Sequence, residues 1–374
     1  MSKLLVVFGT RPEIIKLAPV ILEFRKRNME TLISILNTNQ HKDLVKQYFD
    51  LFEITPDYNL DIMNRGQSLP ELTARTISRL QSQIEEMNKE NRLPEFIMAQ
   101  GDTNTVFASA IVAFLNNIKF AHLEAGLRTF DYHNPYPEEY YRKVASLSTE
   151  IHFAPTEIAK ENLIKEGING EKILITGNTI VDSLMHIKNS EKFFADNISE
   201  EIKKLLGKEN LVLITCHRRE NHGANLQNLI KSVKILSEKY PQYNYIWVSH
   251  PNPNVKNILE SSGLKCSRNV HIIEPVSYIE MISLYGKLSF IMTDSGGIQE
   301  EAPTFKIPLT VIGKKTERIE GILEGFSFLS GTEESEITGS FEKHLNAKVD
   351  ISFNPYGDGK ASARIADYFE KQFA

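Results

Sequence analysis

Acidic side chains recur at the ends of short apolar runs in the first half of the chain. Asp102 follows the run at 96–100, Glu124 ends the run at 120–124, and Glu138 stands soon after it in the first turn of a predicted helix. Each has a structural interpretation, because Asp102 could cap a helix and acidic residues are favoured near helix N-termini. Carboxylates that face one ligand also raise each other's pKa and suit proton transfer. The three form a candidate acid/base set.

The turn after the first apolar run combines a glycine, a helix start and two cations. It reads GTRPEIIK from Gly9 to Lys16, and Pro12 begins a predicted helix whose free N–H groups would face a ligand. Arg11 and Lys16 add positive charge about one helical turn apart. The segment is neither a Walker loop nor GxGxxG. It predicts an anion site, and the alternative is an ordinary strand–helix turn with two solvated bases.

Polar groups also follow three apolar runs in the second half of the chain. LVLIT leads into Cys-His-Arg-Arg, YIWVS into His-Pro-Asn-Pro, and FIMT into Asp-Ser-Gly-Gly. A Ser-Gly-Gly loop that opens a helix presents backbone donors to phosphate oxygens, and a later Glu could chelate ribose hydroxyls. The candidate residues of this half are His217, His250, Ser295, Gly296, Gly297, Glu301 and Arg318.

The spacing of the remaining reactive residues argues against two other chemistries. The ten histidines show no HExxH pairing, and Cys216 and Cys266 stand fifty residues apart, so no metal site is expected. A G-x-S-x-G elbow is absent, which excludes a typical serine hydrolase. His122, His152 and His271 fall on predicted strands, where packed and hydrogen-bonded histidines are the expectation.

Composition narrows the class of ligand and the compartment. Net charge is −5 and the pI is about 6.1, which gives no footprint for nucleic acid or an anionic membrane surface. A small diffusible ligand is the expectation. Two cysteines exclude a disulfide framework, and no apolar run has the length of a signal peptide core or a membrane span. We therefore expect a cytoplasmic protein.

Apolar runs alternate with amphipathic segments along all 374 residues, which at roughly 150 residues per domain suggests two or three domains. Such alternation predicts an α/β fold with parallel sheets covered on both faces. Two Rossmann-like doubly wound domains would turn the carboxyl ends of their strands towards a central cleft, where ligands of such sheets bind. The predicted domains are 1–177 and 178–358, and a C-terminal helix, 359–374, would cross back onto the first. The predicted strands are 4–8, 32–36, 96–100, 120–124, 151–155, 172–176, 211–215, 244–249, 270–273, 288–293 and 308–312, and the predicted helices include 12–27, 68–90, 103–117, 137–148, 156–167, 224–239, 277–286 and 296–304.

Eleven short motifs stand in one order along the chain. They are GTRPEIIKLAP, TNQH, QGDTNTVFAS, HLEAGLRT, PYPEE, FAPTE, TGNTIVDSL, HRREN, HPNPNV, TDSGGIQEEAP and TER. Together they resemble the non-hydrolysing UDP-N-acetylglucosamine 2-epimerase family from about residue 4 to about residue 330, and NPYGDG extends the resemblance. The resemblance implies a glycosyltransferase-B type fold, homodimers, and interconversion of UDP-N-acetylglucosamine with UDP-N-acetylmannosamine for polysaccharide synthesis. It implies no metal and no nicotinamide cofactor.

The same resemblance implies a mechanism and residue roles. In the family, UDP leaves C1 while a base removes the C2 proton, and UDP then re-adds to the glycal as a proton arrives on the other face. By motif, Asp102, Glu124 and Glu138 match the acid/base set, and His217 supports proton transfer or the leaving diphosphate. Which carboxylate removes the proton stays open, because coupled carboxylates resist such assignment. The matched UDP site comprises Arg11, Lys16, His250, Ser295, Gly296, Gly297, Glu301 and Arg318.

Several positions depart from the family pattern. Tyr140 and Tyr141 follow PEE where a small or aliphatic residue and Asn are usual, and Gly313 replaces an Arg that many members carry. These changes leave the exact UDP sugar open. Many bacterial members bind a second substrate molecule as an activator. The matching positions retain Gln40, His41 and Gln67 but lack the Arg, since Arg65 lies one residue away, which argues against activation.

Four alternatives to this epimerase remain at the level of sequence. One is a C2 epimerase of a modified UDP sugar, such as a 2,3-diacetamido or 6-deoxy hexose, and another is a hydrolysing relative that releases N-acetylmannosamine and UDP. The third is a glycosyltransferase of the same fold, which would show no exchange at C2. The last is a sugar-nucleotide-binding protein without turnover, although the three candidate carboxylates are all present.

Overall fold

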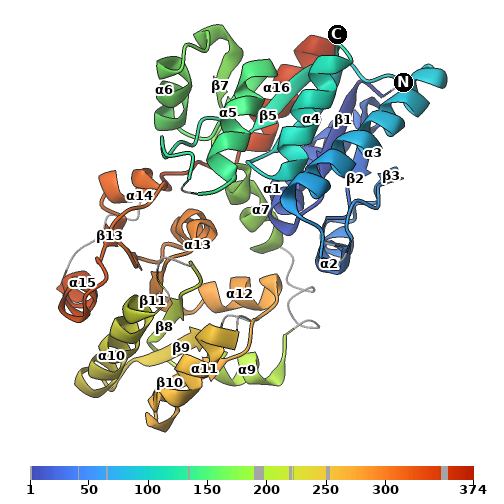
Figure 1. Cartoon of the computed structure of the whole chain (residues 1–374). Helices are drawn as coiled ribbons and strands as arrows, with labels where there is room; N and C mark the ends of the chain where they lie inside the picture. Colours follow the sequence, from blue (N-terminus) through green and yellow to red (C-terminus); the bar gives the residue numbers. More distant parts are fainter. Residues whose placement is uncertain are drawn as a thin grey trace. The chain divides into compact units, whose positions relative to one another are not determined.

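The computed structural model of the chain divides into two compact α/β units. It describes residues 2–40, 42–64, 66–133, 135–188, 198–218, 221, 223–249, 253–346 and 353–374. The first unit comprises Met1–His186 and Tyr356–Ala374, and the second comprises Ile187–Pro355. The strand–helix alternation thus gives two units, each with its own sheet and core (Figure 1).

The first unit is built on a seven-stranded parallel sheet with the order β3-β2-β1-β4-β5-β6-β7. Continuous apolar runs form its central strands because both faces are covered by helices. The chain therefore winds outwards in both directions from β1 and β4, which is the doubly wound arrangement. The strands are β1 (Leu4–Phe8), β2 (Ile33–Asn37), β3 (Tyr58–Asn59), β4 (Phe96–Gln100), β5 (Lys119–Leu123), β6 (Thr149–Ala154) and β7 (Ile173–Ile175).

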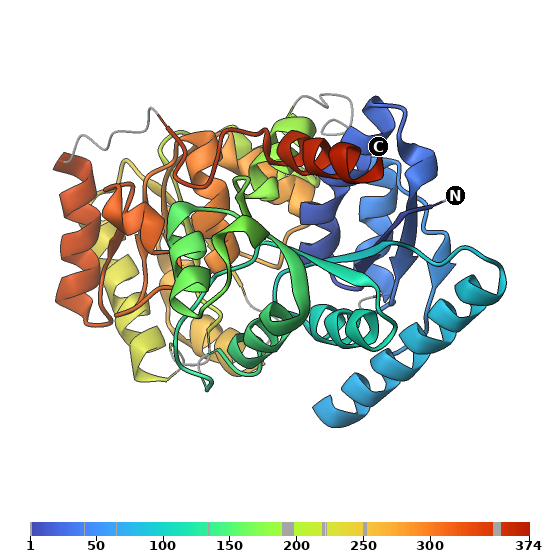
Figure 2. The ribbon, with the colours of Figure 1, turned by 90° about the horizontal axis from the view of Figure 1, so that it is seen from above.

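Helices cover the two faces of this sheet in separate layers. On one face α3, α4 and α5 pack side by side over a core that includes Leu5 and Val7 of β1 and Ile97 of β4 (Figures 1 and 2). On the other face α16 packs along α1, and the Phe369 ring contacts the Phe96 ring with centroids 5.4 Å apart. The helices of this unit are α1 (Arg11–Lys26), α2 (Lys42–Phe52), α3 (Leu69–Lys89), α4 (Asn104–Leu115), α5 (Glu138–Ser148), α6 (Glu157–Lys165), α7 (Thr179–Lys188) and α16 (Ala361–Phe373).

The boundary between the units falls later in the chain than the predicted one after residue 177. Helix α7 was placed in the second domain by the sequence-based division, but its side chains bond within the first unit. The Asp182 carboxylate accepts from the backbone N–H of Ser362 at 2.8 Å, and the Ser183 hydroxyl donates to the Ile15 carbonyl. Asp182 thereby holds the first turn of α16, whose free N–H groups need such an acceptor.

The second unit has a six-stranded parallel sheet with the order β10-β9-β8-β11-β12-β13. Trp247 and Tyr245 of β9 and Phe341 of α15 fill its core, and α15 packs along α10 (Figure 1). The strands are β8 (Leu211–Thr215), β9 (Asn244–Val248), β10 (Val270–Ile273), β11 (Leu288–Thr293), β12 (Leu309–Val311) and β13 (Ser327–Leu329), and the helices are α9 (Glu200–Leu206), α10 (Ala224–Lys239), α11 (Pro253–Ser261), α12 (Tyr278–Tyr285), α13 (Gly296–Glu301), α14 (Ile319–Leu323) and α15 (Glu334–Asn346).

The predicted fold class is confirmed, since both sheets are parallel and doubly wound. The order of strands reverses between β1 and β4 in the first sheet and between β8 and β11 in the second, and these two places are the switch points of the sheets. Ligands of such sheets bind outside the carboxyl ends of the strands at these two points. Among the described residues no helix is long and apolar enough to cross a membrane.

Candidate functional site

The turn after β1 lies at the switch point of the first sheet. A Cβ atom on Gly9 would fall 1.8 Å from the Thr38 hydroxyl oxygen, so only glycine fits beside the neighbouring strand end. The fully buried Glu13 carboxylate accepts from the backbone N–H groups of Gly9 at 2.7 Å and Thr10 at 2.6 Å, and from the Thr103 hydroxyl. Glu13 thus joins the turn after β1 to the turn after β4. Sequence reasoning gave it no role, although it is the fifth residue of the GTRPE motif.

Glu124 follows β5 directly and is held by a buried lysine. Its backbone has φ +62°, a left-handed conformation that costs a non-glycine residue on the order of 1 kcal/mol and is concentrated at functional sites. The Lys16 ammonium lies 2.7 and 2.6 Å from the two carboxylate oxygens, and the Gln100 side chain donates to the same group. Both charged residues are buried. Lys16, matched to the UDP site by sequence, here neutralises a candidate catalytic acid.

Asp102 and Glu138 lie close enough to interact electrostatically with each other and with Arg142. Asp102 is not the helix cap that its position allowed, because Thr103 is the N-cap of α4 and its hydroxyl accepts from the Val106 N–H. The Asp102 carboxylate instead pairs with the Arg142 guanidinium at 3.2 Å and keeps about a third of its side chain exposed, 33%. Burial, and next the charge of Asp102, raise the pKa of Glu138. The structure therefore brings two of the three predicted carboxylates together.

His122 has a structural role, in line with its expected packing. The ring is fully buried beneath these loops, and its Nε2 atom lies 2.7 Å from the Gly101 carbonyl oxygen. Burial lowers its pKa to about 3, so the imidazole is neutral at physiological pH. It supports the turn that carries Asp102.

Asp294, directly after β11, organises the switch point of the second sheet. Its buried carboxylate accepts from the backbone N–H groups of His217 at 3.0 Å and Arg218 at 2.9 Å, and from the Asn221 amide at 2.9 Å. The His217 Nδ1 atom lies 2.9 Å from the same carboxylate. Burial opposes ionisation, but the hydrogen bond and charge of His217, with Asn221, hold the pKa of Asp294 at about 2. Sequence reasoning quoted Asp294 at its strand end and assigned it no role.

Arg218 and Arg318, near the same switch point, are both held by acidic side chains. The Glu317 carboxylate accepts from Arg218 at 2.7 Å and Arg318 at 2.6 Å, and Glu300 accepts from Arg318 Nε at 2.9 Å. Burial opposes the shift, but the charges of Arg318 and Arg218 hold the pKa of Glu317 at about 2. A Cβ atom on Gly296 would meet the Arg318 guanidinium at 3.1 Å. The predicted residues Arg318 and Gly296 are therefore in contact.

The other predicted residues are placed as follows. Ser295 is the N-cap of α13, with its hydroxyl accepting from the Ile298 N–H, and Gly297 follows in the first turn. The Glu301 carboxylate accepts from the hydroxyl groups of Tyr278 at 3.2 Å and Tyr285 at 2.6 Å. Arg11 is exposed at the start of α1.

The predicted regulatory positions are only partly described. The Gln67 side-chain oxygen accepts from the Asn64 N–H at 3.0 Å, and the buried Gln40 side-chain oxygen has no hydrogen-bond partner among the residues that the structure describes. His41 and His250, together with Arg65, lie outside the described residues. Within the described part of the chain, no group of three or more His, Cys, Asp or Glu side chains could hold a metal ion.

Comparison with known proteins identifies the family. Residues 23–370 match the family model described as UDP-N-acetylglucosamine 2-epimerase. The chain is 40% identical over 374 residues to the UDP-N-acetylglucosamine 2-epimerase of Neisseria meningitidis, with 98% of each chain covered. The chain belongs to the UDP-N-acetylglucosamine 2-epimerase family. The predicted resemblance is confirmed.

Further relatives extend this match to structure. The UDP-N-acetylglucosamine 2-epimerase of Bacillus subtilis is 36% identical, with 98% of this chain and 94% of that protein covered. The crystal structure of the Neisseria enzyme, solved with UDP-GlcNAc bound, superposes with a TM-score of 0.86 over 98% of this chain and 99% of that one. A Methanocaldococcus jannaschii UDP-GlcNAc 2-epimerase, solved with UDP-GlcNAc and UDP, is 35% identical with a TM-score of 0.80 over 98% and 99%.

Two departures from the pattern of this epimerase family have local physical reasons. Tyr141 is buried, with its ring 4.7 Å from that of Phe107 and its hydroxyl 3.5 Å from the Thr73 hydroxyl, so it packs α5 against α3 and α4. Gly313 has φ +136°, where a side chain is strained, and its N–H donates to Gly331. Tyr140 stays half exposed beside Tyr132.

Proposed function

We propose that this chain interconverts UDP-N-acetylglucosamine and UDP-N-acetylmannosamine by inverting the sugar at C2. Membership of the 2-epimerase family carries the proposal, and two solved relatives were crystallised with UDP-GlcNAc. The acid cluster at the first switch point agrees with it, because inversion at C2 needs groups that remove and return a proton. Burial of Glu138 beside Asp102 supplies two carboxyl groups in different electrostatic environments.

The chemistry proceeds by elimination and re-addition. The C2 proton of the sugar is not adjacent to a carbonyl group, so its removal must be coupled to departure of UDP from C1. A carboxylate takes the C2 proton as the C1–O bond breaks, which leaves a C1–C2 double bond and UDP. In the return step a UDP oxygen attacks C1, and a carboxylic acid delivers a proton to the opposite face of C2. Atoms and charge balance without a redox cofactor.

The residues divide between these tasks. Asp102, Glu124 and Glu138 are the proposed acid/base groups, and His217 assists proton transfer or the leaving diphosphate. Retention of UDP between the two steps requires cations and backbone donors, since each charge-assisted contact contributes about 1.5–3 kcal/mol. The proposed UDP ligands are Arg11, Lys16, His250, Ser295, Gly296, Gly297, Glu301 and Arg318.

Isotope exchange tests the proposal directly. With UDP-N-acetylglucosamine in D2O, the enzyme should place deuterium at C2 and form the manno epimer, as followed by proton NMR and mass spectrometry. Net release of free N-acetylmannosamine and UDP would instead indicate a hydrolysing enzyme. Absence of C2 exchange with this and related UDP sugars would contradict the epimerase.

A second substrate remains a candidate because Tyr140 departs from the family pattern next to Glu139 and is half exposed. A 2,3-diacetamido or 6-deoxy UDP sugar would share the UDP site and differ only at the hexose. Comparison of kcat/KM across a panel of UDP sugars separates the two. We also propose a cytoplasmic homodimer, as the family resemblance implies, which sedimentation and cell fractionation would test.

A further inference from the structure

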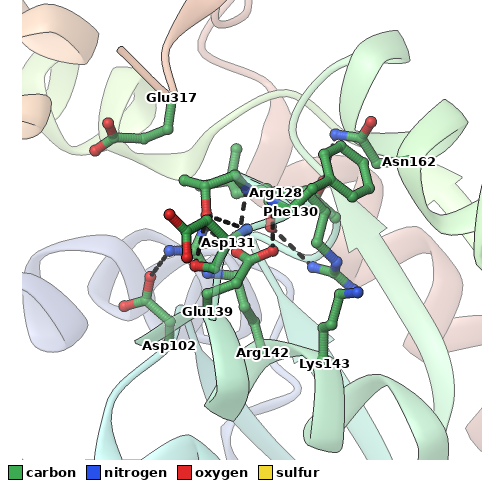
Figure 3. Close-up of polar contacts among 12 residues, drawn as sticks. Asp102, Arg128, Phe130, Asp131, Glu139, Arg142, Lys143, Asn162 and Glu317 are labelled. Atoms are coloured by element: carbon green, nitrogen blue, oxygen red, sulfur yellow. Dashed lines mark hydrogen bonds and ion pairs between the residues drawn. The ribbon is translucent and has the colours of Figure 1, made fainter. Parts of the chain in front are cut away.

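Arg142 is buried among three acidic side chains of the first unit. Only 3% of its side chain is exposed. Its Nη2 atom lies 3.2 Å from Asp102, and its Nη1 atom lies 3.4 Å from Glu139 (Figure 3). Its charge also acts on the neighbouring Glu138, whose pKa it lowers against the larger effect of burial. One guanidinium thus connects two proposed acid/base groups with a third carboxylate.

Glu139 anchors this guanidinium to the rest of the fold. It is completely buried and accepts from the backbone N–H groups of Thr129 at 3.2 Å and Phe130 at 3.0 Å. Those residues belong to the loop that begins with Glu124 after β5. A buried carboxylate that accepts from two backbone donors and also pairs with the Arg142 charge has little freedom to move, because any displacement leaves a buried polar group without its partner. Glu139 therefore fixes Arg142 without any ligand.

Glu138, adjacent in sequence, differs from Glu139 in its surroundings. Its Oε2 atom is buried and has no hydrogen-bond partner in the described structure. Asp102, in contrast, has the guanidinium and partial contact with solvent. The two carboxyl groups near the first switch point are therefore electrostatically unequal, and the position of Arg142 decides which one is better compensated.

We propose that Arg142, held by Glu139, is a positioning residue that keeps Asp102 beside Glu138, so that one carboxyl is ionised and the other retains its proton when turnover begins. This inference rests on the proposed function and deepens it. In one direction the ionised Asp102 would accept the C2 proton, and Glu138 would supply the proton to the opposite face. In the reverse direction the roles exchange, as reversible catalysis requires.

Other charged groups near Arg142 do not replace it. From β5, His122 is buried with its pKa lowered to about 3 and is therefore uncharged at working pH. From the loop after β5, Arg128 is fully occupied by Glu166 at 2.8 Å and the Ser146 hydroxyl at 2.9 Å. Helix α4, which packs against α5, carries no titratable side chain. Among these described residues, Arg142 is the cation that pairs with Asp102 and acts on Glu138, and Glu139 acts on it through their ion pair.

The test compares kcat/KM against pH for C2 deuterium exchange in wild type, Arg142→Met and Arg142→Lys. Loss of the cation disfavours both carboxylates, so Arg142→Met should move both limbs of the profile to higher pH and reduce turnover about 100-fold. Arg142→Lys keeps the charge and should return both limbs towards their original pH. UDP binding, measured by calorimetry, should remain in both variants.

Arg128→Met is the matched control, because it removes an equally buried arginine whose acidic partner is Glu166. It should lower Tm and leave the pH limbs in place. Glu139→Gln gives a second test with an almost unchanged shape. It removes a negative charge, so both limbs should move to lower pH, opposite to Arg142→Met.

The outcomes are separable. Two results would overturn the inference and show that the arginine is merely structural. In one, Arg142→Met lowers turnover but leaves both limbs of the pH profile in place. In the other, Glu139→Gln moves the limbs to higher pH, as Arg142→Met does. If Arg142→Met does not fold, the opposing shift of Glu139→Gln and the Lys variant still decide. Absence of C2 exchange in wild type would contradict the proposed function instead.

Discussion

The two switch points differ in which member of a charged pair, the acid or the base, is the more exposed. In the first unit the more exposed member of the pair is an acid, with Asp102 33% exposed against 3% for Arg142. In the second unit it is a base, with His217 41% exposed against 0% for Asp294. Basic side chains support acids at the first site, and acids support basic side chains at the second. The more exposed member of the pair is therefore acidic in one unit and basic in the other.

The difference matches two requirements of the proposed elimination, which must remove a proton from carbon and must also keep the UDP leaving group bound. Proton removal from carbon needs carboxylates with unequal affinity for protons, and retention of a diphosphate needs fixed cations. A buried charge is costly unless it is paired, so each exposed group requires an opposite charge beneath it. Glu317 and Glu300 pair in this way with Arg318, and Lys16 pairs with Glu124, which is itself buried. The proposed acid/base carboxylates belong to the first unit, and the proposed UDP ligands apart from Arg11 and Lys16 belong to the second.

The largest effect is expected when one of the proposed acid/base carboxylates of the first unit is replaced. Asp102→Asn, Glu124→Gln and Glu138→Gln should each reduce turnover by about 10²- to 10⁴-fold, the usual contribution of one acid/base group. Each substitution preserves shape and leaves the second unit untouched, so UDP should still bind. Steady-state kinetics with calorimetric titration of UDP measures both quantities. A variant that lost UDP affinity instead of turnover would break the division of roles.

Much of the fold was predictable from the sequence because its strands are continuous apolar runs. The structure reproduces 4–8, 96–100, 211–215, 270–273 and 288–293 as predicted, since parallel strands covered on both faces consist mostly of apolar residues. Other elements, such as α7, α9 and the short β13, were missed. They stand in polar or mixed segments without clear periodicity, where packing within the unit decides the structure.

The candidate site was predictable where its residues stand at the ends of strands. Asp102, Glu124 and His217 follow strands, and that position places them at the edge of the sheet where ligands bind. Their supports Glu13 and Glu139 carry no comparable signal, because burial beneath a loop depends on contacts between distant segments. Asp294 does follow a strand, but its role in holding His217 depends on such contacts too. Lys16 shows the same limit: its sequence position predicted a phosphate ligand, and only the fold reveals its pairing with Glu124.

Arg318→Ala removes a cation of the second unit that we propose as a UDP ligand. Loss of a charge-assisted contact to the diphosphate should weaken UDP binding by about 1.5–3 kcal/mol, with the proton-transfer groups of the first unit unaffected. Calorimetry at two salt concentrations measures the loss. Arg27→Ala is the control, since Arg27 makes a comparable network with Asp367 and Glu23 in the first unit, away from both switch points. Unchanged UDP affinity in Arg318→Ala would remove Arg318 from the proposed site.

His122 sharpens the comparison because, within the described part of the chain, no acid pairs with this buried histidine, unlike His217. Its pKa is lowered to about 3 in the folded protein, against about 6.5 when unfolded. Below pH 6.5 the unfolded chain binds a proton that the folded chain does not, so stability is lost as pH falls. The expected loss is about 2 kcal/mol between pH 6.5 and 4.5. Urea unfolding at both pH values should show a smaller loss for His122→Asn and an unchanged loss for the exposed His133→Asn.

The smallest effect is expected for Asp294→Asn, which keeps the shape of the support and removes its charge. The asparagine oxygen can still accept from the backbone N–H groups of His217 and Arg218, so the loop should keep its conformation. Its amide group, however, cannot accept the Nδ1–H of His217, and the imidazole proton is expected to move to Nε2. Turnover should fall about tenfold, equivalent to about 1.4 kcal/mol.

Asn221→Ala removes a different donor to Asp294 and should leave the His217 tautomer unchanged in ¹⁵N NMR. Because Asp294 acts only through His217, combining Asp294→Asn with His217→Asn should cost no more than His217→Asn alone. Additive losses would mean that the buried acid holds the loop as a whole and does not orient the histidine.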